Sequence, residues 1–351
     1  MDCPLILECT LRDGSYVIDF QFTVDDTMQI CRALDKAGFP YIEVGHGIGM
    51  GASGKGLNIA AASDKEYMEA AARGVTRNKW GMFCIPGIAT LDNVRMAADC
   101  GMHFIRIGTN VTEIDESEPF INLARTLRLE VFANFMKSYA LPPEQFAKIA
   151  AKSAGFGANL VYLVDSAGGM LPTEVRTYVQ ATRAELSDLP LGFHGHNNLG
   201  LAVANSLVCA EEGVAIIDTS LQGFGRSAGN TPTEQFLSAL VRAGAEPTVN
   251  PIEAMHLGET LIRPRIEQRG LNSLDIVAGL AQFHSSYMPA VLRAAKKHRV
   301  DPRILILELC KHDKVDVPTE LLERLGAKLA YEHKVHGVMP WGTYFGEEQA
   351  P

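Results

Sequence analysis

Two charged side chains stand next to each other directly after the first apolar run of the sequence, in Thr10-Leu11-Arg12-Asp13-Gly14. A carboxylate at a strand end can hold a metal ion or a proton, and a guanidinium can stabilise a developing oxyanion. Adjacent residues on a strand face opposite sides, but Gly14 allows a turn that brings both to one site. A surface ion pair at a strand end explains the same two residues, so other parts of the sequence must decide.

The tripeptide His194-Gly195-His196 gives the sharpest indication of chemistry. Residues i and i+2 on a strand point to the same side, so the two imidazoles can ligate one cation. Asp13 follows the first apolar run and the histidines lie on the seventh, and alternate strands of a barrel share interior layers. Asp13, His194 and His196 are therefore predicted to hold a divalent metal with open positions for a substrate. The alternative is that one histidine is a core residue and the other caps a helix.

Three further candidates have ordinary alternatives. Lys137 could form a Schiff base with a carbonyl substrate, but a pocket or surface lysine explains it better. The glycines of residues 45–56 suit a flexible active-site loop better than a phosphate cradle, because no Walker lysine pattern is present. Asn230, in the glycine-rich stretch of residues 223–230, is either a polar neighbour of the metal or part of the loop structure.

Eight short apolar runs alternate with helical patterns and must position these residues. The runs are residues 4–9, 41–44, 79–85, 103–107, 130–134, 160–164, 191–194 and 215–218. Strands that are apolar throughout are buried on both faces, as parallel strands are. Eight strand–helix units in about 240 residues predict a (β/α)8 TIM barrel. A doubly wound open sheet is the competing fold, but residues 12–16 are not the phosphate-binding turn that it would need.

The strand–helix cycle stops near residue 249. Helical patterns without intervening strands follow in residues 251–261, 274–280, 288–297, 302–311 and 318–332. We therefore expect a catalytic barrel domain over residues 1–248 and a helical C-terminal domain over residues 249–351. The helical extension is expected to pack over one end of the barrel, and the tail 342–351 to be poorly ordered.

Composition and charge exclude several classes of function. The 351 residues are 47% hydrophobic and can bury a large core. A formal net charge of -9 without a basic cluster argues against nucleic acid or an anionic membrane as partner. Neither a membrane-length apolar run nor a secretory signal is visible. The seven cysteines form no C-x-x-C pair, which predicts reduced thiols in a cytoplasmic protein.

Several motifs together resemble the DRE-TIM metallolyases. They are Thr10-Leu11-Arg12-Asp13-Gly14, Glu43 at the end of the second run, His194-Gly195-His196-Asn197-Asn198, and residues 223–230. That superfamily includes CoA-ester lyases, isopropylmalate- and homocitrate-type synthases, and 4-hydroxy-2-oxovalerate aldolases. The sequence is most similar to the aldolases, through residues 43–47, 63–67 and 165–169 and Ser285-Ser286. The resemblance extends over nearly the whole chain.

The resemblance implies roles for the residues already singled out. Asp13, His194 and His196 would hold the cation, usually Mn²⁺ in that family, with Mg²⁺, Co²⁺ or Zn²⁺ as alternatives. The reaction would cleave a 4-hydroxy-2-oxo acid to pyruvate and an aldehyde, or run in reverse. Arg12 would stabilise the pyruvate enolate. Substrate binding would involve Arg12, Ser166 and Glu43, with Ser166 near the carboxylate.

Two positions depart from the aldolase pattern. The family has a histidine three residues after the metal aspartate, as base on the substrate hydroxyl, and a tyrosine just before the Ser-Ser pair. This sequence has Tyr16 and His284 at those places. The simplest hypothesis is that the two residue types are exchanged and His284 is the base, because a histidine pKa near neutral suits proton transfer. The alternative is a substrate that needs another acid–base arrangement.

Other functions stay open on the sequence alone. A Claisen-type acyl-CoA condensing enzyme or lyase of the same superfamily would need a CoA channel, and no basic cluster for the adenine or phosphates is evident. A non-catalytic barrel subunit would not need so many polar strand ends. As partners, the resemblance implies a small 2-oxo acid, an acylating aldehyde dehydrogenase bound through the helical C-terminus, and further copies of the chain in a homo-oligomer.

Overall fold

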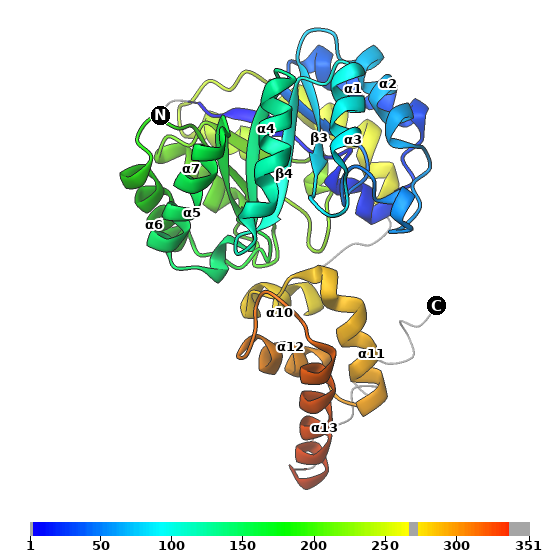
Figure 1. Cartoon of the computed structure of the whole chain (residues 1–351), viewed down its shortest axis with the longest axis vertical. Coiled ribbons are helices and arrows are strands. Elements are labelled where there is room, and N and C mark those ends of the chain that lie inside the picture. The colour runs from blue at the N-terminus through cyan, green and yellow to red at the C-terminus, as the bar shows by residue number, and fades with distance from the viewer. Residues whose placement is uncertain (1–2, 267–272, 337–351) are drawn as a thin grey trace.

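The computed structural model describes residues 3–266 and 273–336. Eight parallel strands form a closed barrel in sequence order, with helices around it (Figure 1). The strands are β1 (Leu5–Glu8), β2 (Tyr41–Val44), β3 (Lys79–Cys84), β4 (Phe104–Asn110), β5 (Glu130–Met136), β6 (Leu160–Asp165), β7 (Leu191–Gly195) and β8 (Ile216–Thr219). Leu5 of β1 pairs with Ile216 of β8, which closes the sheet. The predicted TIM barrel is confirmed, and the competing open sheet is excluded.

One helix follows each strand and covers the outside of the barrel. These helices are α1 (Val24–Ala37), α2 (Asp64–Gly74), α3 (Leu91–Asp99), α4 (Glu118–Thr126), α5 (Pro143–Phe156), α6 (Pro172–Glu185), α7 (Ala202–Glu211) and α8 (Thr233–Arg242). Local chemistry sets their ends. Thr23 and Asp26 form a reciprocal capping box at the start of α1, and Gly38 ends that helix at a φ of 88°.

The barrel interior has an apolar floor with a charged layer above it. Tyr41, Phe104 and Phe132 pack together in the floor, and the rings of Phe104 and Phe132 stack with centroids 5.2 Å apart. Two residues further along β2 and β4, and therefore on the same side of each strand, are Glu43 and Arg106. The alternation that fills the floor thus also turns charged groups inward near the carboxyl ends of the strands.

The chain after α8 contributes to two different hydrophobic cores. Ala254 and Leu257 of α9 (Pro251–Leu257) and Ile262 belong to the core of the barrel. A separate core, running from Val277 to Leu329, is formed by α10 (Ser273–Ala281), α11 (Met288–His298), α12 (Pro302–Cys310) and α13 (Thr319–His336). The division into domains at residue 248 stays a prediction, and the tail 342–351 lies outside the described residues.

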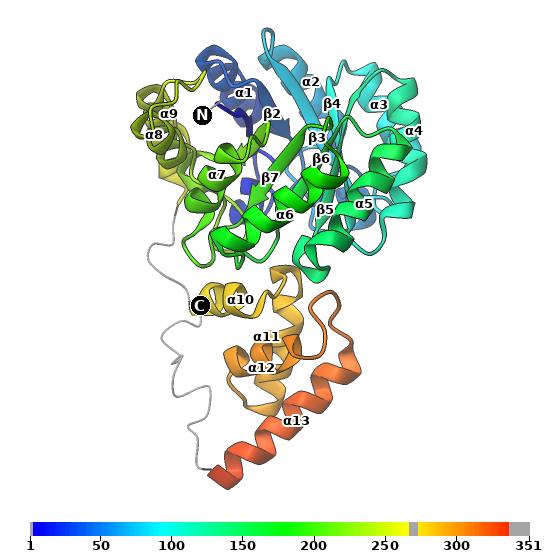
Figure 2. The ribbon, with the colours of Figure 1, turned by 90° about the vertical axis from the view of Figure 1, so that its left-hand side faces the viewer.

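Helices α10 to α13 lie beyond one end of the barrel (Figures 1 and 2). That end is the carboxyl end of the strands, because loops after β5, β7 and β8 hold them. Lys137 Nζ donates to Tyr287 Oη, Asn198 Nδ2 donates to the Asp275 carbonyl, and Ser227 Oγ donates to Asp275 Oδ1. The helical extension therefore covers the end of the barrel at which strand-end side chains gather. Within the described residues, no helix combines the length and apolarity that crossing a membrane requires.

Candidate metal centre and active site

The structure brings together the two histidines and the aspartate that the sequence singled out. Asp13 opens a 3-10 helix (Asp13–Ile18) after β1, His194 lies on β7, and His196 follows that strand. One ligand atom from each lies within 4.8 Å of the others, and all three residues are buried. Their predicted convergence is found, while metal ligation itself stays a proposal.

The surroundings of the three side chains fit a divalent cation. His194 Nδ1 donates to Asp218 Oδ2 at 2.8 Å, and His196 Nδ1 lies 3.2 Å from the Gly229 carbonyl oxygen. Both contacts orient Nε2 as the ligand atom, which is the usual arrangement of metal-binding histidines. Burial, with Arg226 adding to it, lowers the pKa of His196 well below 6.5 and favours the neutral imidazole that binds metals.

Asp13 is held in its ionised form. Burial alone would raise the pKa of its carboxyl, but the nearby charge of Arg12 and smaller contributions from His196 and His194 outweigh that effect. Its pKa therefore lies well below the ordinary value of 3.8. One carboxylate with two imidazoles is a ligand set that divalent transition metals accept while keeping open positions.

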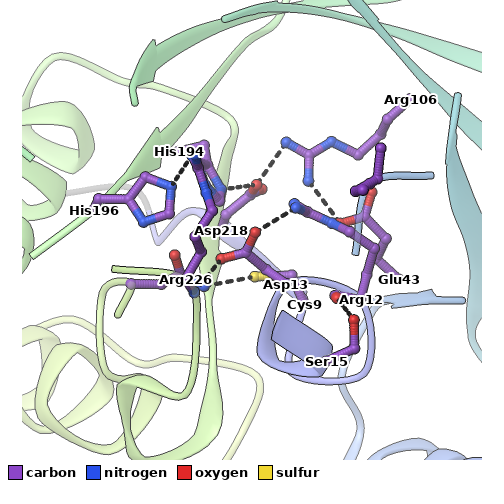
Figure 3. Close-up of polar contacts among 12 residues, drawn as sticks. Cys9, Arg12, Asp13, Ser15, Glu43, Arg106, His194, His196, Asp218 and Arg226 are labelled. Carbon is purple, nitrogen blue, oxygen red and sulfur yellow. Dashed lines mark hydrogen bonds and ion pairs between the residues drawn. The ribbon is translucent and has the colours of Figure 1, made fainter. Parts of the chain in front are cut away.

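An unbroken series of buried ion pairs connects one side of this cluster to the other (Figure 3). Arg12 donates through Nη1 to Asp13 Oδ1 at 2.5 Å and through Nε to Glu43 Oε2 at 2.7 Å. Arg106 contacts Glu43 Oε2 through Nη1 at 3.1 Å and Asp218 Oδ2 through Nη2 at 2.6 Å. The series in full is Asp13, Arg12, Glu43, Arg106, Asp218 and His194.

These ion pairs fix positions more than they add stability. Burying two charges costs about as much as their attraction returns, but removing one partner leaves the other charge buried and costs roughly 3–5 kcal/mol. Arg106 is fully buried, and its guanidinium carbon also lies 4.4 Å from the ring centroid of Tyr162. Since Glu43, Arg106 and Asp218 all belong to strands, Arg12 and His194 are supported by the most rigid part of the fold.

Arg226 is a residue of this site to which the sequence alone assigned no role. It lies in the glycine-rich loop after β8, and its backbone N–H donates to Asp13 Oδ2 at 3.3 Å. Its Nη2 lies 3.1 Å from His196 Nε2, and its guanidinium carbon lies 5.8 Å from the centroid of the Tyr16 ring. An arginine in a glycine-rich loop is ordinarily exposed to solvent, so the local sequence offered no signal for this placement.

Tyr16 and His284, the two positions that depart from the aldolase pattern, both contact the guanidinium of Arg226. Arg226 Nη1 is 3.2 Å from His284 Nε2 and 3.1 Å from Ser285 Oγ. Burial, followed by the charges of Arg226 and Lys137, lowers the pKa of His284 well below 6.5, so this imidazole is neutral near pH 7. Burial raises the pKa of Tyr16 above its ordinary value of 10.0, so its hydroxyl is protonated.

Ser166 and Lys137 lie at neighbouring strand ends but point differently. Ser166 Oγ accepts a hydrogen bond from the Lys137 backbone N–H at 2.9 Å, so its own hydroxyl proton stays available. The Lys137 ammonium donates to Tyr287 Oη at 3.3 Å and to the Val315 carbonyl. It is thus engaged with the helical extension, and this geometry gives no support to a Schiff-base role.

The remaining sequence candidates lie beside the site. Asn230 Nδ2 is 3.6 Å from Cys9 Sγ, and its Oδ1 is buried without a hydrogen-bond partner among the residues that the structure describes. Gly47 explains part of the glycine-rich loop, because a Cβ there would lie 2.6 Å from Cε2 of Tyr16. The loop therefore allows Tyr16 to approach closely.

Comparisons with known proteins give a consistent result. The HMGL-like family model matches residues 4–261. A 4-hydroxy-2-oxovalerate aldolase of Carboxydothermus hydrogenoformans is 34% identical over 94% of this chain and 98% of its own. Aldolases of the same name from Pelotomaculum thermopropionicum and Pseudomonas putida are 39% and 36% identical, over 87% and 93% of this chain and 89% and 95% of theirs.

Solved structures resemble this one at the level of the fold. The carboxyl transferase domain of Rhizobium etli pyruvate carboxylase superposes with a TM-score of 0.76, covering 94% of this chain and 60% of that chain. The two sequences are 16% identical, so this similarity supports the barrel architecture alone.

Proposed function

The chain belongs to the HMGL-like family, and we propose that it is a divalent-metal-dependent aldolase, a carbon–carbon lyase. It would cleave a 4-hydroxy-2-oxo acid to pyruvate and an aldehyde, or catalyse the reverse addition. The observation that supports this most is the buried cluster of Asp13, His194 and His196 with the guanidinium of Arg12 directly beside it. The aldolases named above, similar over nearly their whole length, support the same reaction.

Asp13, His194 and His196 would hold the metal through one carboxylate oxygen and two imidazole Nε2 atoms. We propose Mn²⁺ as the native ion, as the resemblance to the aldolase family implies, with Mg²⁺, Co²⁺ and Zn²⁺ as the ions to compare. When bound, the cation would supply Lewis-acid polarisation of the keto group of the substrate.

Arg12 would stabilise the enolate that forms as the bond breaks. Its Nε and Nη1 are occupied by Glu43 and Asp13, and no partner is found for Nη2 among the described residues. A guanidinium fixed in this way can donate hydrogen bonds to a developing oxyanion without reorganising. Such preorganised donors are the main source of electrostatic stabilisation of a transition state. The free hydroxyl proton of Ser166 would bind the substrate carboxylate, and Glu43 would act by holding Arg12 in place.

Proton transfer at the C4 end would involve His284 and Tyr16. His284, neutral near pH 7, would accept the proton of the C4 hydroxyl. The C3–C4 bond then breaks, the aldehyde leaves, and the bonding electrons pass to C3 and the C2 oxygen to give the pyruvate enolate. Protonation at C3 yields pyruvate. Tyr16, which stays protonated, would donate a hydrogen bond to the C4 oxygen.

A screen of racemic 4-hydroxy-2-oxo acids with added Mn²⁺ tests this function. The expected result is equimolar release of pyruvate and aldehyde that a chelator stops and Mn²⁺ restores. Release of pyruvate that persists in chelator, together with borohydride trapping of the substrate, would indicate a lysine mechanism instead. Release of CoA from acetyl-CoA and a 2-oxo acid, without any aldol cleavage, would favour the Claisen-type enzyme.

The partners and location follow as further proposals. Helices α10 to α13 expose large apolar side chains, among them Leu280 at 64% and Tyr331 at 72% exposure, which suits a docking surface for an acylating aldehyde dehydrogenase or a second copy of the chain. Light scattering of the chain alone and with such a dehydrogenase would separate the two. All seven cysteines are free thiols, which supports a reducing compartment such as the cytoplasm.

A further inference from the structure

Arg226 is a positive charge inside the site whose side-chain partners carry no negative charge. Its guanidinium lies within hydrogen-bond distance of His196, His284 and Ser285. Within residues 3–266 and 273–336, no carboxylate forms an ion pair with it; Asp13 is reached only by its backbone N–H. The other two arginines of the site differ, because Arg12 and Arg106 each bind two carboxylates.

Both imidazoles beside Arg226 are needed for other tasks. Nε2 of His196 would bind the metal, because its Nδ1 faces the Gly229 carbonyl. Nε2 of His284 would take the substrate proton, because its Nδ1 lies 2.6 Å from Ser286 Oγ. Neither nitrogen can accept a hydrogen bond from Arg226 while it does so. The guanidinium therefore needs another acceptor in the working enzyme, and a carboxylate is the group that a planar guanidinium binds best.

The position of Arg226 indicates which part of the substrate would supply that carboxylate. Its neighbours Tyr16 and His284 act at the C4 end of the substrate in the proposed reaction, and Ser285 follows His284 in the chain. The C1 end is served by the metal ligands and by Ser166, which follows β6. Arg226 adjoins the proposed ligand His196, but no contact between Arg226 and Ser166 is found in the described parts of the chain. A group attached to C4 is thus the one that Arg226 can reach.

The net charge of the site also favours a substrate with a second carboxylate. Among the residues of the ion-pair series and Arg226, the carboxylates of Asp13, Glu43 and Asp218 balance the guanidinium groups of Arg12, Arg106 and Arg226, and the ammonium of Lys137 is engaged with the helical extension. A divalent cation then leaves two positive charges in a buried space. A substrate with two carboxylates offsets more of this charge than a substrate with one.

We infer that the aldehyde half of the substrate carries a carboxylate on C4, so that the enzyme acts on 4-hydroxy-2-oxo dicarboxylic acids and releases pyruvate and a 2-oxo acid aldehyde. Arg226 binds that second carboxylate and determines specificity. This inference rests on the aldolase function proposed above and names its substrate class. The C4 hydroxyl proton still passes to His284, and the C3–C4 bond still breaks as in the general reaction.

Equilibrium binding tests the inference without requiring turnover. The probes are 2-oxoglutarate and 2-oxopentanoate, which have the same chain length and differ only in a terminal carboxylate or methyl group. Calorimetry on the Mn²⁺-loaded protein should show 2-oxoglutarate binding roughly 10- to 100-fold more tightly. Arg226→Met should bring the two affinities together, and the matched variant Arg226→Lys should restore part of the difference. A preference that survives in Arg226→Met, or an equal loss for both probes, would overturn the assignment.

Turnover provides the second arm of the test. The ratio of kcat/KM for 4-hydroxy-2-oxoglutarate to that for 4-hydroxy-2-oxovalerate should exceed roughly tenfold in the wild type and fall toward unity in Arg226→Met. Cleavage of both substrates without preference would overturn the role of Arg226 and leave the aldolase function standing. Cleavage of neither substrate, with 2-oxoglutarate still preferred in binding, would overturn the aldolase function and leave the second anion site standing.

Discussion

The site has two halves that are held in different ways. The strand half consists of Arg12, Asp13, Glu43, Arg106, His194 and Asp218, joined by buried ion pairs. The loop half consists of Tyr16, Arg226, His284 and Ser285. These residues lie in loops and short 3-10 helices and are joined by contacts between neutral groups and one guanidinium. Every charge of the strand half has an opposite charge beside it, whereas Arg226 has none on its side chain among the described residues.

This difference means that the geometry of the strand half is fixed, whereas the contacts of the loop half can change when substrate binds. Moving any charge of the strand half would leave another charge buried and unpaired, so its geometry is strongly determined. The loop half can exchange its partners for substrate at little cost, because neutral acceptors are weaker than carboxylates. We therefore expect the strand half, with His196 and Ser166 beside it, to bind the metal and the oxo-acid end, and the loop half to act on C4 and select the substrate.

The largest effect should come from breaking the strand half at the metal. Asp13→Ala removes the carboxylate ligand and should lower kcat/KM by at least about 1,000-fold, with loss of tight Mn²⁺ binding. Pyruvate release and a metal titration measure this. Asp92→Ala, which removes an exposed aspartate of α3, is the matched control and should behave as the wild type. Full, chelator-resistant activity in Asp13→Ala would refute the metal role.

Changes in the loop half should reduce catalysis while leaving the metal in place. His284→Ala removes the proposed base and should lower kcat by roughly 100- to 10,000-fold. Tyr16→Phe keeps the ring but loses the hydroxyl, so its effect should be smaller. Single-turnover measurements with Mn²⁺-loaded variants make the comparison. If Tyr16→Phe costs more than His284→Ala, the exchange of the two residue types does not include an exchange of roles.

A smaller effect is expected where the strand half supports the metal indirectly. Asp218→Asn weakens the hydrogen bond that orients His194 and should lower Mn²⁺ affinity by roughly 10- to 100-fold. It also removes one of the two carboxylates of Arg106, which should destabilise the fold by up to about 3–5 kcal/mol. Metal titration and denaturant unfolding measure the two quantities. Asp115→Asn, on an exposed carboxylate, is the control and should change neither.

The smallest expected effect is the response of the wild type to pH. The pKa of His284 lies well below 6.5, so its neutral, proton-accepting form is already complete at pH 7. The rate of C–C cleavage should therefore be level from about pH 6.5 to 8 and fall only at lower pH. A tyrosine base with its pKa raised above 10.0 would instead give about tenfold more rate per pH unit. A profile of kcat against pH separates the two bases.

Several features of this site could be predicted from sequence because they depend on local spacing. The spacing of His194 and His196 places both imidazoles on one side of β7, and the eight apolar runs predict a barrel that brings Asp13 to them. Arg106 and Asp218 fall within the predicted apolar runs, but the sequence alone assigned them no role. A charged residue inside an apolar strand is buried and needs a partner of opposite charge, so the sequence could have predicted a buried ion pair at these positions.

The placement of Arg226 had no comparable signal. The direction of the Arg226 side chain depends on its contacts with His284 and Ser285, which come 58 and 59 residues later in the chain. Those two residues reach the site through the packing of α10 and α11. The contribution of α9 to the barrel core was missed for a similar reason, because an amphipathic helix does not reveal which core it covers. Contacts between segments far apart in the sequence determine both the placement of Arg226 and the packing of α9.

The division of the site predicts that the strand half, together with His196 and Ser166, binds the oxo-acid end of the substrate and that the loop half does not. Oxalate, a planar mimic of the pyruvate enolate, tests it by calorimetry on Mn²⁺-loaded variants that have both lost cleavage activity. Arg12→Met is predicted to weaken oxalate binding by at least about tenfold, and His284→Ala by less than about threefold. An equal loss of oxalate affinity in the two variants would contradict the division of the site into two halves.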